Sequence, residues 1–248
     1  MTSAPVTCDL NCDLGEDPES LETDRELLTI ITSANIACGG HAGDERSMHT
    51  IAALARDKNV AIGAHPSYPD RANFGRTTLS ISPEDLARSL RDQITTLRDT
   101  CRALHVDLMH IKPHGALYHD ASRDPHIAAA IARAALDAAP SALLIAQARS
   151  PAAARWRSLG LTVIEEAFAD RAYAADGSLL PRSHPAALIT DPALAASQAL
   201  HLIRTLNPGT LCIHADTPGS PGIARAVAAI LRSSSIRIAP PRQPSPRF

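Results

Sequence analysis

Seven short apolar runs, separated by helical patterns, are the feature that most constrains the fold of this 248-residue chain. The runs are rich in β-branched residues, which is typical of buried strands. They cover residues 6–14, 31–39, 60–66, 108–115, 142–148, 161–168 and 210–216. Apolar residues spaced at i, i+3, i+4 and i+7 predict helices over 44–59, 82–104, 124–139, 150–160 and 191–206. This alternation predicts an α/β fold, either a β/α barrel or a doubly wound sheet.

Four of the predicted helices begin with a Ser-Pro or Asp-Pro pair, at Ser82, Asp124, Ser150 and Asp191. The Ser or Asp side chain can accept a hydrogen bond from a free backbone N–H, and proline suits the first helical position. No change of composition interrupts the strand and helix patterns, so we expect a single domain over residues 1–238. The Pro-rich segment 239–248 is predicted to be a poorly ordered tail or an extended arm.

Charge and cysteine content exclude several classes of protein. A net charge of −2 gives no general attraction to nucleic acid or to an anionic membrane. The five cysteines have no CxxC spacing, which indicates buried thiols in a reducing compartment. We find no signal-peptide pattern at the N-terminus and no apolar stretch of membrane-spanning length. The expectation is therefore a cytoplasmic protein that acts on a small molecule.

Side chains capable of chemistry follow six of the seven predicted strands. In parallel β/α folds the C-terminal ends of the strands meet at one rim, so we expect these residues to share a cavity. The residues predicted to act in catalysis are Asp13, Glu16, His41, His65, Lys112, His114 and Asp216. Those predicted to bind substrate or nucleotide are Asn11, Asn35, Asp44, Arg76, Tyr118, Asp170, Arg171, Arg182 and His214. The same strand ends also carry His110, Glu165 and Glu166.

Each of these residues also has a purely structural interpretation. An isolated aspartate at a strand end is commonly a turn or cap residue, and the histidines could be metal ligands, general bases or ordinary hydrogen-bonded side chains. No HExxH or paired HxH motif occurs, so the sequence assigns no residue to a metal. The phosphate-binding motif GxxxxGK[ST] is absent too, because neither of the two lysines, Lys58 and Lys112, follows the required glycines.

Lys112 and two arginines stand out among the candidates. Lys112 lies between His110 and His114 in HIKPHGALYH, and we interpret it as a point charge placed in a cleft. The long irregular stretch 168–185 carries Arg171 and Arg182. A guanidinium group can bind a carboxylate or a phosphate through two parallel hydrogen bonds, so this stretch is predicted to hold an anion.

Six segments, in order, resemble the successive sequence blocks of the LamB/YcsF family: DLNCDLGE, SANIACGGHAGD, AIGAHPSYPDRANFGR, HIKPHGALYH, EAFADRAYAADGSLLPRS and HADTPG. The resemblance covers about residues 8–231. It implies a single-domain, TIM-barrel-like (β/α) barrel of seven strands, similar to the glycoside hydrolase/polysaccharide deacetylase fold. The sequence departs from the family pattern at Cys12, Gly40 and Ala215, and the segment after Glu16 is shortened.

The resemblance also implies an activity, the ATP-dependent opening of 5-oxo-L-proline to L-glutamate in a complex with 5-oxoprolinase subunits B and C. A homo-oligomer is also compatible with it. The co-substrate would be ATP with Mg²⁺. Two alternatives stay open, a metal-dependent deacetylase or amidohydrolase and a non-catalytic binding subunit of the complex.

Roles for the site residues follow from this activity. Lys112 would stabilise charge on the phosphoryl or lactam oxygen. Asp13, Glu16 or His65 would act as general base. Either Arg171 or Arg182 would clamp an anion, and Asp216 or Asp44 would bind Mg²⁺.

Overall fold

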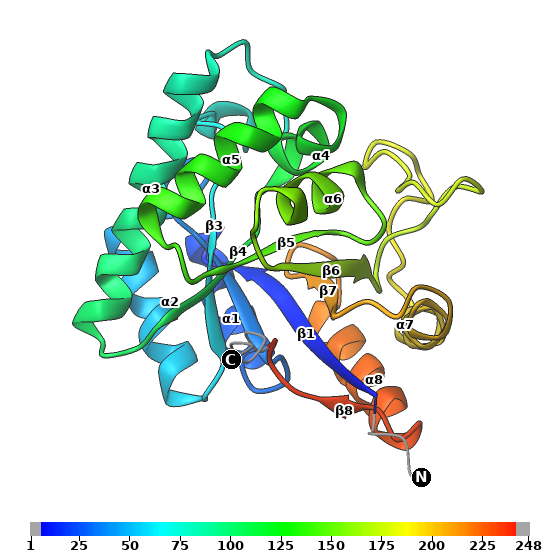
Figure 1. The fold of residues 1–248 in the computed structure, drawn as a ribbon. Helices are drawn as coiled ribbons and strands as arrows, with labels where there is room; N and C mark the ends of the chain where they lie inside the picture. The colour runs from blue at the N-terminus through cyan, green and yellow to red at the C-terminus, as the bar shows by residue number, and fades with distance from the viewer. Residues whose placement is uncertain (1–5, 242–248) are drawn as a thin grey trace, which may run out of the picture.

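A closed barrel of parallel strands forms the centre of the computed structural model, which describes residues 6–241 (Figure 1). Its strands are β1 (Thr7–Leu14), β2 (Ser33–Ala37), β3 (Ala61–His65), β4 (Leu108–Ile111), β5 (Leu143–Gln147), β6 (Val163–Phe168) and β7 (Thr210–His214). The strands neighbour one another in chain order from β2 to β7, and β1 closes the ring by pairing with both β7 and β2. The barrel alternative is therefore confirmed and the doubly wound sheet is excluded.

Helices surround the strands (Figure 1). They are α1 (Leu21–Leu27), α2 (Glu45–Asp57), α3 (Pro83–Ala103), α4 (Gly115–Arg123), α5 (Pro125–Ala138), α6 (Pro151–Ser158), α7 (Pro192–Leu206) and α8 (Ser220–Ser233), with short 3₁₀ turns at Pro18–Ser20 and Arg71–Asn73. The five predicted helices are confirmed as α2, α3, α5, α6 and α7. All four Ser-Pro or Asp-Pro starts are confirmed as caps, because each side chain accepts a hydrogen bond from a backbone N–H of the first turn.

Three helices and one strand were not predicted. Helices α1, α4 and α8 are additional, and β4 is shorter than the predicted strand 108–115 because α4 begins at Gly115. The short strand β8 (Arg237–Ile238) pairs with Thr7 and Cys8 of β1, outside the barrel. Most of the predicted tail, residues 242–248, lies outside the described residues. Within residues 6–241, none of the helices combines the length and apolar character needed to cross a membrane.

Strand β1 shows how the barrel divides its side chains between two faces. Successive strand residues point to opposite sides, and β1 alternates strictly between apolar and polar residues from Cys8 onward. Leu10 and Cys12 belong to the apolar core between strands and helices. The side chains of Asp9, Asn11 and Asp13 point the other way, and all three are buried. The alternation therefore separates an apolar side that faces the helices from a polar side that faces the barrel interior. Both sides are buried, so neither is exposed to solvent.

Polar groups fill the barrel interior from its floor upward. Near the floor, the Asp9 carboxylate accepts hydrogen bonds from Thr32, Ser33 and Thr210 at 2.6, 2.8 and 2.6 Å. Burial raises the pKa of Asp9 and the hydroxyl donors lower it, and burial outweighs them, so the pKa is raised to about 6.

All five cysteines are buried and free, as predicted.

Candidate functional site

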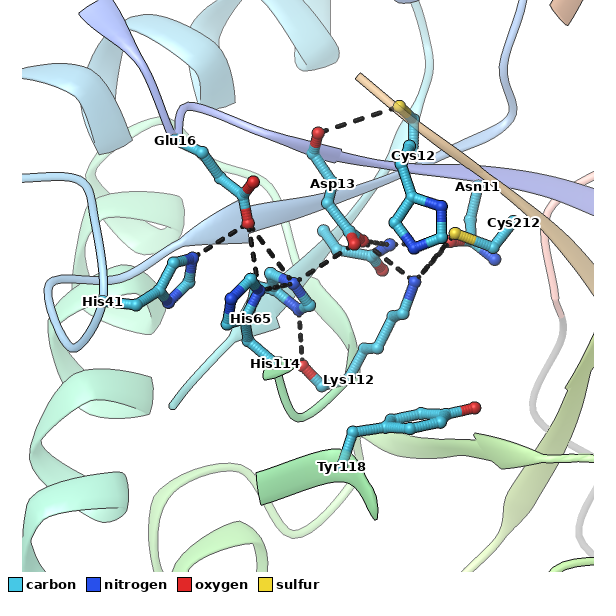
Figure 2. A network of polar contacts seen from close by, with 12 residues as sticks. Asn11, Cys12, Asp13, Glu16, His41, His65, Lys112, His114, Tyr118 and Cys212 are labelled. Atoms are coloured by element: carbon cyan, nitrogen blue, oxygen red, sulfur yellow. Dashed lines mark hydrogen bonds and ion pairs between the residues drawn. The ribbon is translucent and has the colours of Figure 1, made fainter. Parts of the chain in front are cut away.

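The Lys112 ammonium group lies at the centre of a buried network above this floor (Figure 2). Its Nζ lies 2.9 Å from Asp13 Oδ1 and 3.0 Å from Glu166 Oε1. Cys212 Sγ and Asn11 Oδ1 are also close, at 3.1 and 3.2 Å. Burial lowers the pKa of Lys112, but Asp13, Cys212 and Glu166 raise it well above its usual value. Lys112 is therefore a permanent cation.

Side-chain amides orient the two carboxylates around Lys112. Asn35 Nδ2 donates to Asn11 Oδ1 at 2.7 Å and to Asp13 Oδ1 at 2.8 Å, while Asn11 Nδ2 donates to Glu166 Oε1 at 2.9 Å. His110 Nε2 donates to Asn35 Oδ1 at 2.7 Å. Burial lowers the pKa of His110 to about 3, so this imidazole stays neutral. These hydrogen bonds hold Asp13 Oδ1 and Glu166 Oε1 in the positions where they pair with the Lys112 ammonium group.

Next to this network lies a histidine cluster, made of Glu16, His41, His65 and His114 (Figure 2). Glu16 Oε1 is 2.9 Å from His41 Nε2, 3.1 Å from His114 Nδ1 and 3.6 Å from His65 Nε2. The rings of His41 and His114 are stacked with centroids 3.6 Å apart. One carboxylate oxygen thus faces three imidazoles that come from different loops and strands.

Burial and charge set the protonation of the histidine cluster. Burial lowers the pKa of His41 to about 4 and also lowers the pKa of His114. Burial acts in the same direction on His65, but the Asp13 carboxylate raises the pKa of His65 above its usual value. Burial raises the pKa of Glu16, yet the adjacent imidazoles of His114 and His41 hold it well below the usual range. Glu16 is therefore ionised at neutral pH.

A further histidine, His214, is held by its own carboxylate, Asp170. Asp170 accepts from His214 Nδ1 at 2.9 Å, from the His214 backbone N–H at 2.9 Å and from Thr217 Oγ1 at 2.6 Å. Burial raises the pKa of Asp170, but His214 lowers it below its usual value. These bonds leave His214 Nε2 as the nitrogen available to a bound molecule.

A cavity of about 450 Å³ opens above these groups, a size that suits a small molecule. Its wall carries most of the predicted site residues, namely Asp13, His65, Arg76, Lys112, His114, Tyr118, Arg171, Arg182 and His214. Tyr118 donates its hydroxyl hydrogen to Glu166 Oε2 at 3.0 Å, which ties this wall to the Lys112 network. Phe168, Leu179 and Leu180 add apolar surface.

Arginines occupy two positions around the cavity. Arg76 and Arg182 both donate to Asp216 Oδ2, at 2.8 and 2.7 Å. Arg171 is buried and donates to the backbone carbonyl groups of Leu180 and Ala187, so its guanidinium fixes the shape of the 168–185 loop.

The structure brings nearly all the predicted residues together. Each either lines the cavity or contacts a residue that does, with the exception of Asp44. Asp44 is the exposed N-cap of α2 and exchanges hydrogen bonds with Ser47 in a capping box, which is the structural interpretation of an isolated aspartate. Glu166 and Cys212 complete the Lys112 network but were not chosen from the sequence. The sequence places Glu166 at its strand end without a role, and both residues share the inward alternation of Phe168 and His214.

Comparisons with known proteins agree with the fold and with the resemblance. The chain is 42% identical to a 5-oxoprolinase A subunit from Chloroflexus aurantiacus, over 96% of this chain and all of that protein. It superimposes on the crystal structure of a lactam utilization protein from Thermus thermophilus with a TM-score of 0.87 and 37% identity, over 94% of this chain and 99% of that one. A family 4 carbohydrate esterase from Streptomyces lividans shares the fold at a TM-score of 0.50 and 9% identity, over 95% of this chain and 93% of that one. The LamB/YcsF family model matches residues 8–245, and the chain belongs to that family.

Proposed function

We propose that this protein opens the cyclic amide of 5-oxo-L-proline to give L-glutamate, as the A subunit of an ATP-dependent 5-oxoprolinase that also contains subunits B and C. The names of its relatives, a 5-oxoprolinase A subunit and a lactam utilization protein, support a cyclic amide as substrate. One observation carries the proposal: the buried ammonium of Lys112, flanked by Asp13 and Glu166, forms part of the wall of a small-molecule cavity.

Lactam hydrolysis needs a positive group at the carbonyl oxygen and a base for the attacking water. The lactam is resonance-stabilised, so its oxygen must be polarised or phosphorylated before attack. Lys112 would stabilise the negative charge that develops there, in a site from which water is largely excluded. Its ammonium is already oriented by four acceptors and needs little reorganisation during the reaction.

Asp13 is the base we assign among the three candidates. Its Oδ1 is bound to Lys112 and Asn35, while Oδ2 lies 3.4 Å from His65 Nε2. Burial raises the pKa of Asp13, but His65 and Lys112 lower it well below its usual value, so it is ionised and able to accept a proton. Negative charge that develops on the substrate oxygen offsets part of the Lys112 charge that acts on Asp13, so the basicity of Asp13 rises. General-base catalysis of this kind contributes typically ~10²–10⁴-fold in rate.

Arg76 and Arg182 would hold the carboxylate of 5-oxoproline or a phosphate group. Both guanidinium groups already converge on one carboxylate oxygen of Asp216, an arrangement that suits an anion. Because Asp216 is paired with two cations, we assign it to holding these arginines and not to Mg²⁺. ATP with Mg²⁺ is proposed as the co-substrate of the assembled complex.

Reconstitution tests the proposal. The chain is purified alone and with subunits B and C, and glutamate release from 5-oxoproline is measured with and without ATP. We expect release only with all three subunits and ATP. Lys112→Met should lower turnover by about two orders of magnitude, which corresponds to roughly 2.7 kcal/mol of transition-state stabilisation.

Lys58 provides a matched control, because it is the other lysine of the chain and is exposed at the end of α2. Lys58→Met should leave turnover unchanged. Full turnover by Lys112→Met in an intact complex would show that this chain only binds. Deacetylation at a rate that does not depend on ATP, with no release of glutamate, would favour a deacetylase instead.

A further inference from the structure

Two imidazole nitrogens in the histidine cluster face each other with no hydrogen between them in the neutral state. His65 Nδ1 lies 2.7 Å from the carbonyl oxygen of Lys112, and His114 Nε2 lies 3.0 Å from that of Phe74. A carbonyl oxygen only accepts, so each of these nitrogens must carry the ring N–H. The lone pairs of the neutral rings are then on His65 Nε2 and His114 Nδ1, which lie 3.0 Å apart. Lone pairs at this distance repel unless a proton or a cation lies between them.

Glu16 completes a set of ligand atoms with the spacing of a metal site. Its Oε1 lies 3.1 Å from His114 Nδ1 and 3.6 Å from His65 Nε2. An ion bound tetrahedrally at ~2.0–2.1 Å from nitrogen and oxygen holds its ligand atoms about 3.3–3.4 Å apart, which lies within the observed range. We propose that Glu16 Oε1, His65 Nε2 and His114 Nδ1 bind one divalent transition-metal ion of the zinc class.

The chemistry of this ligand set selects the kind of ion. Two imidazoles with one carboxylate suit zinc, cobalt or iron(II), whereas Mg²⁺ and Ca²⁺ prefer oxygen ligands alone. The two backbone carbonyl groups that accept from His65 and His114 are the outer partners that orient metal-binding histidines. Three protein ligands leave one position open, where a bound ion supplies a Lewis acid or an activated water.

His41 acts on this site through Glu16. Its Nδ1 is buried and has no hydrogen-bond partner within residues 6–241. A buried N–H without a partner is rarer than a buried acceptor without one, so the ring hydrogen belongs on Nε2. His41 Nε2 then donates to Glu16 Oε1 at 2.9 Å, and its ring stacks on that of His114. His41 is therefore a positioning residue for Glu16.

The second group of candidate ligands near the cavity is already occupied by a cation. Asp13, Cys212 and His214 also have ligand atoms close together. Lys112 Nζ lies 2.9 Å from Asp13 Oδ1 and 3.1 Å from Cys212 Sγ, and so fills the place an ion would take. Within residues 6–241, no lysine or arginine forms an ion pair with Glu16, the carboxylate of the histidine cluster. The proposed metal site depends on these contacts alone and not on the identity of the substrate.

Metal binding is measured on the full chain after removal of metal with a chelator. Zn²⁺ is titrated calorimetrically, and the melting temperature is recorded with and without Zn²⁺. We expect one equivalent to bind with a dissociation constant of about 1 μM or lower and to raise the melting temperature. Co²⁺ should give the visible absorption bands of a four-coordinate ion without the near-ultraviolet charge-transfer band of a thiolate.

Variants locate the site. Glu16→Gln and His114→Gln should abolish the tight equivalent, and His41→Gln should weaken it about 10–100-fold, as loss of an outer partner does. His201→Gln, at an exposed histidine of α7, is the matched control and should bind as wild type does. Circular dichroism confirms that each variant is folded. The Co²⁺ spectrum of the wild type tests the ligand set even if a variant fails to fold.

Three results would overturn the proposal. Absence of saturable binding to the wild type would mean that His65 and His114 share a proton and not a metal. Equal binding by wild type, Glu16→Gln and His114→Gln would place the ion elsewhere. A thiolate band in the Co²⁺ spectrum would place the ion at a cysteine and therefore outside the proposed ligand set.

Discussion

Replacing Lys112 by methionine would remove the only cation between two buried carboxylates in the described part of the chain while keeping a side chain of similar length. Lys112, Asp13 and Glu166 have side chains that are 3%, 8% and 0% exposed, so water cannot replace the lost charge. At N–O separations of 2.9 and 3.0 Å and an effective dielectric constant of about 20, each ion pair contributes about 5–6 kcal/mol of attraction. Desolvation of the ions offsets much of this, and loss of one partner of a buried pair costs about 3–5 kcal/mol.

Urea denaturation followed by circular dichroism measures this cost. We expect Lys112→Met to lower the free energy of unfolding by about 3–5 kcal/mol, out of the ~5–15 kcal/mol of a natural domain. Adding Glu166→Gln removes one uncompensated charge, so the double variant should recover about 1–3 kcal/mol in a double-mutant cycle. Turnover of Lys112→Met must accordingly be assayed at a temperature where its unfolding curve shows the variant to be folded.

The reasoning would be refuted by a Lys112→Met variant that unfolds at the wild-type urea midpoint with an unchanged slope. That result would mean that Asp13 and Glu166 are hydrated or protonated in the folded protein. Lack of any coupling between Lys112→Met and Glu166→Gln would likewise contradict an ion pair between the two side chains.

Three further predictions concern buried groups of the protein. Because burial raises the pKa of Asp9 from 3.8 to about 6, the folded state binds its proton more tightly than the unfolded state, and a penalty of up to about 3 kcal/mol accumulates as the pH rises from about 4 to about 6. The free energy of unfolding of wild type, relative to that of Asp9→Asn, should therefore increase as the pH falls from 7 to 4. A difference between the two that does not change with pH would contradict this. Gly63→Ala should destabilise the protein by ~1–3 kcal/mol in urea denaturation, because its Cβ would lie 2.1 Å from His110 Nε2; unchanged stability would mean that the ring moves freely. The five buried cysteines should resist a thiol reagent in the native protein and all react in denaturant, and fast native labelling would show that the barrel opens.

Local signals explain which parts of the fold could be predicted. The caps Ser82 and Asp191 identify the starts of their helices because capping involves only neighbouring residues. Helix α8 carried a similar signal, the Ser-Pro pair at Ser220, and was within reach of the sequence. Helix α4 could not be predicted in this way, because it begins at Gly115 without a side-chain cap and directly after the strand-like run. Closure of the barrel depends on pairing between distant strands, which no local pattern encodes.

The site could be located from the sequence, but its contacts could not be assigned. Strand ends collect at one rim in any parallel barrel, so the shared cavity followed from topology. The choice between Glu165 and Glu166 depends on which of them faces inward. Glu165 pairs with Arg157 on the outside, whereas Glu166 is buried against Lys112. Asp44 shows the converse, since a residue just beyond a strand end can serve only as a helix cap.

The pairing of β1 with β7 has a consequence for synthesis of the protein. Asp9 and Asn11 each bind Thr210, across sequence separations of 201 and 199 residues. At a translation rate of ~5–20 residues per second, β1 leaves the ribosome about 10–40 s before its partner strand exists. During that time β1 can pair with β2, and Thr32 and Ser33 can donate to Asp9, but the edge of β1 that faces β7 has no partner. Barrel closure therefore cannot precede synthesis of β7, and a chain stalled before β7 would stay open to chaperones and proteases.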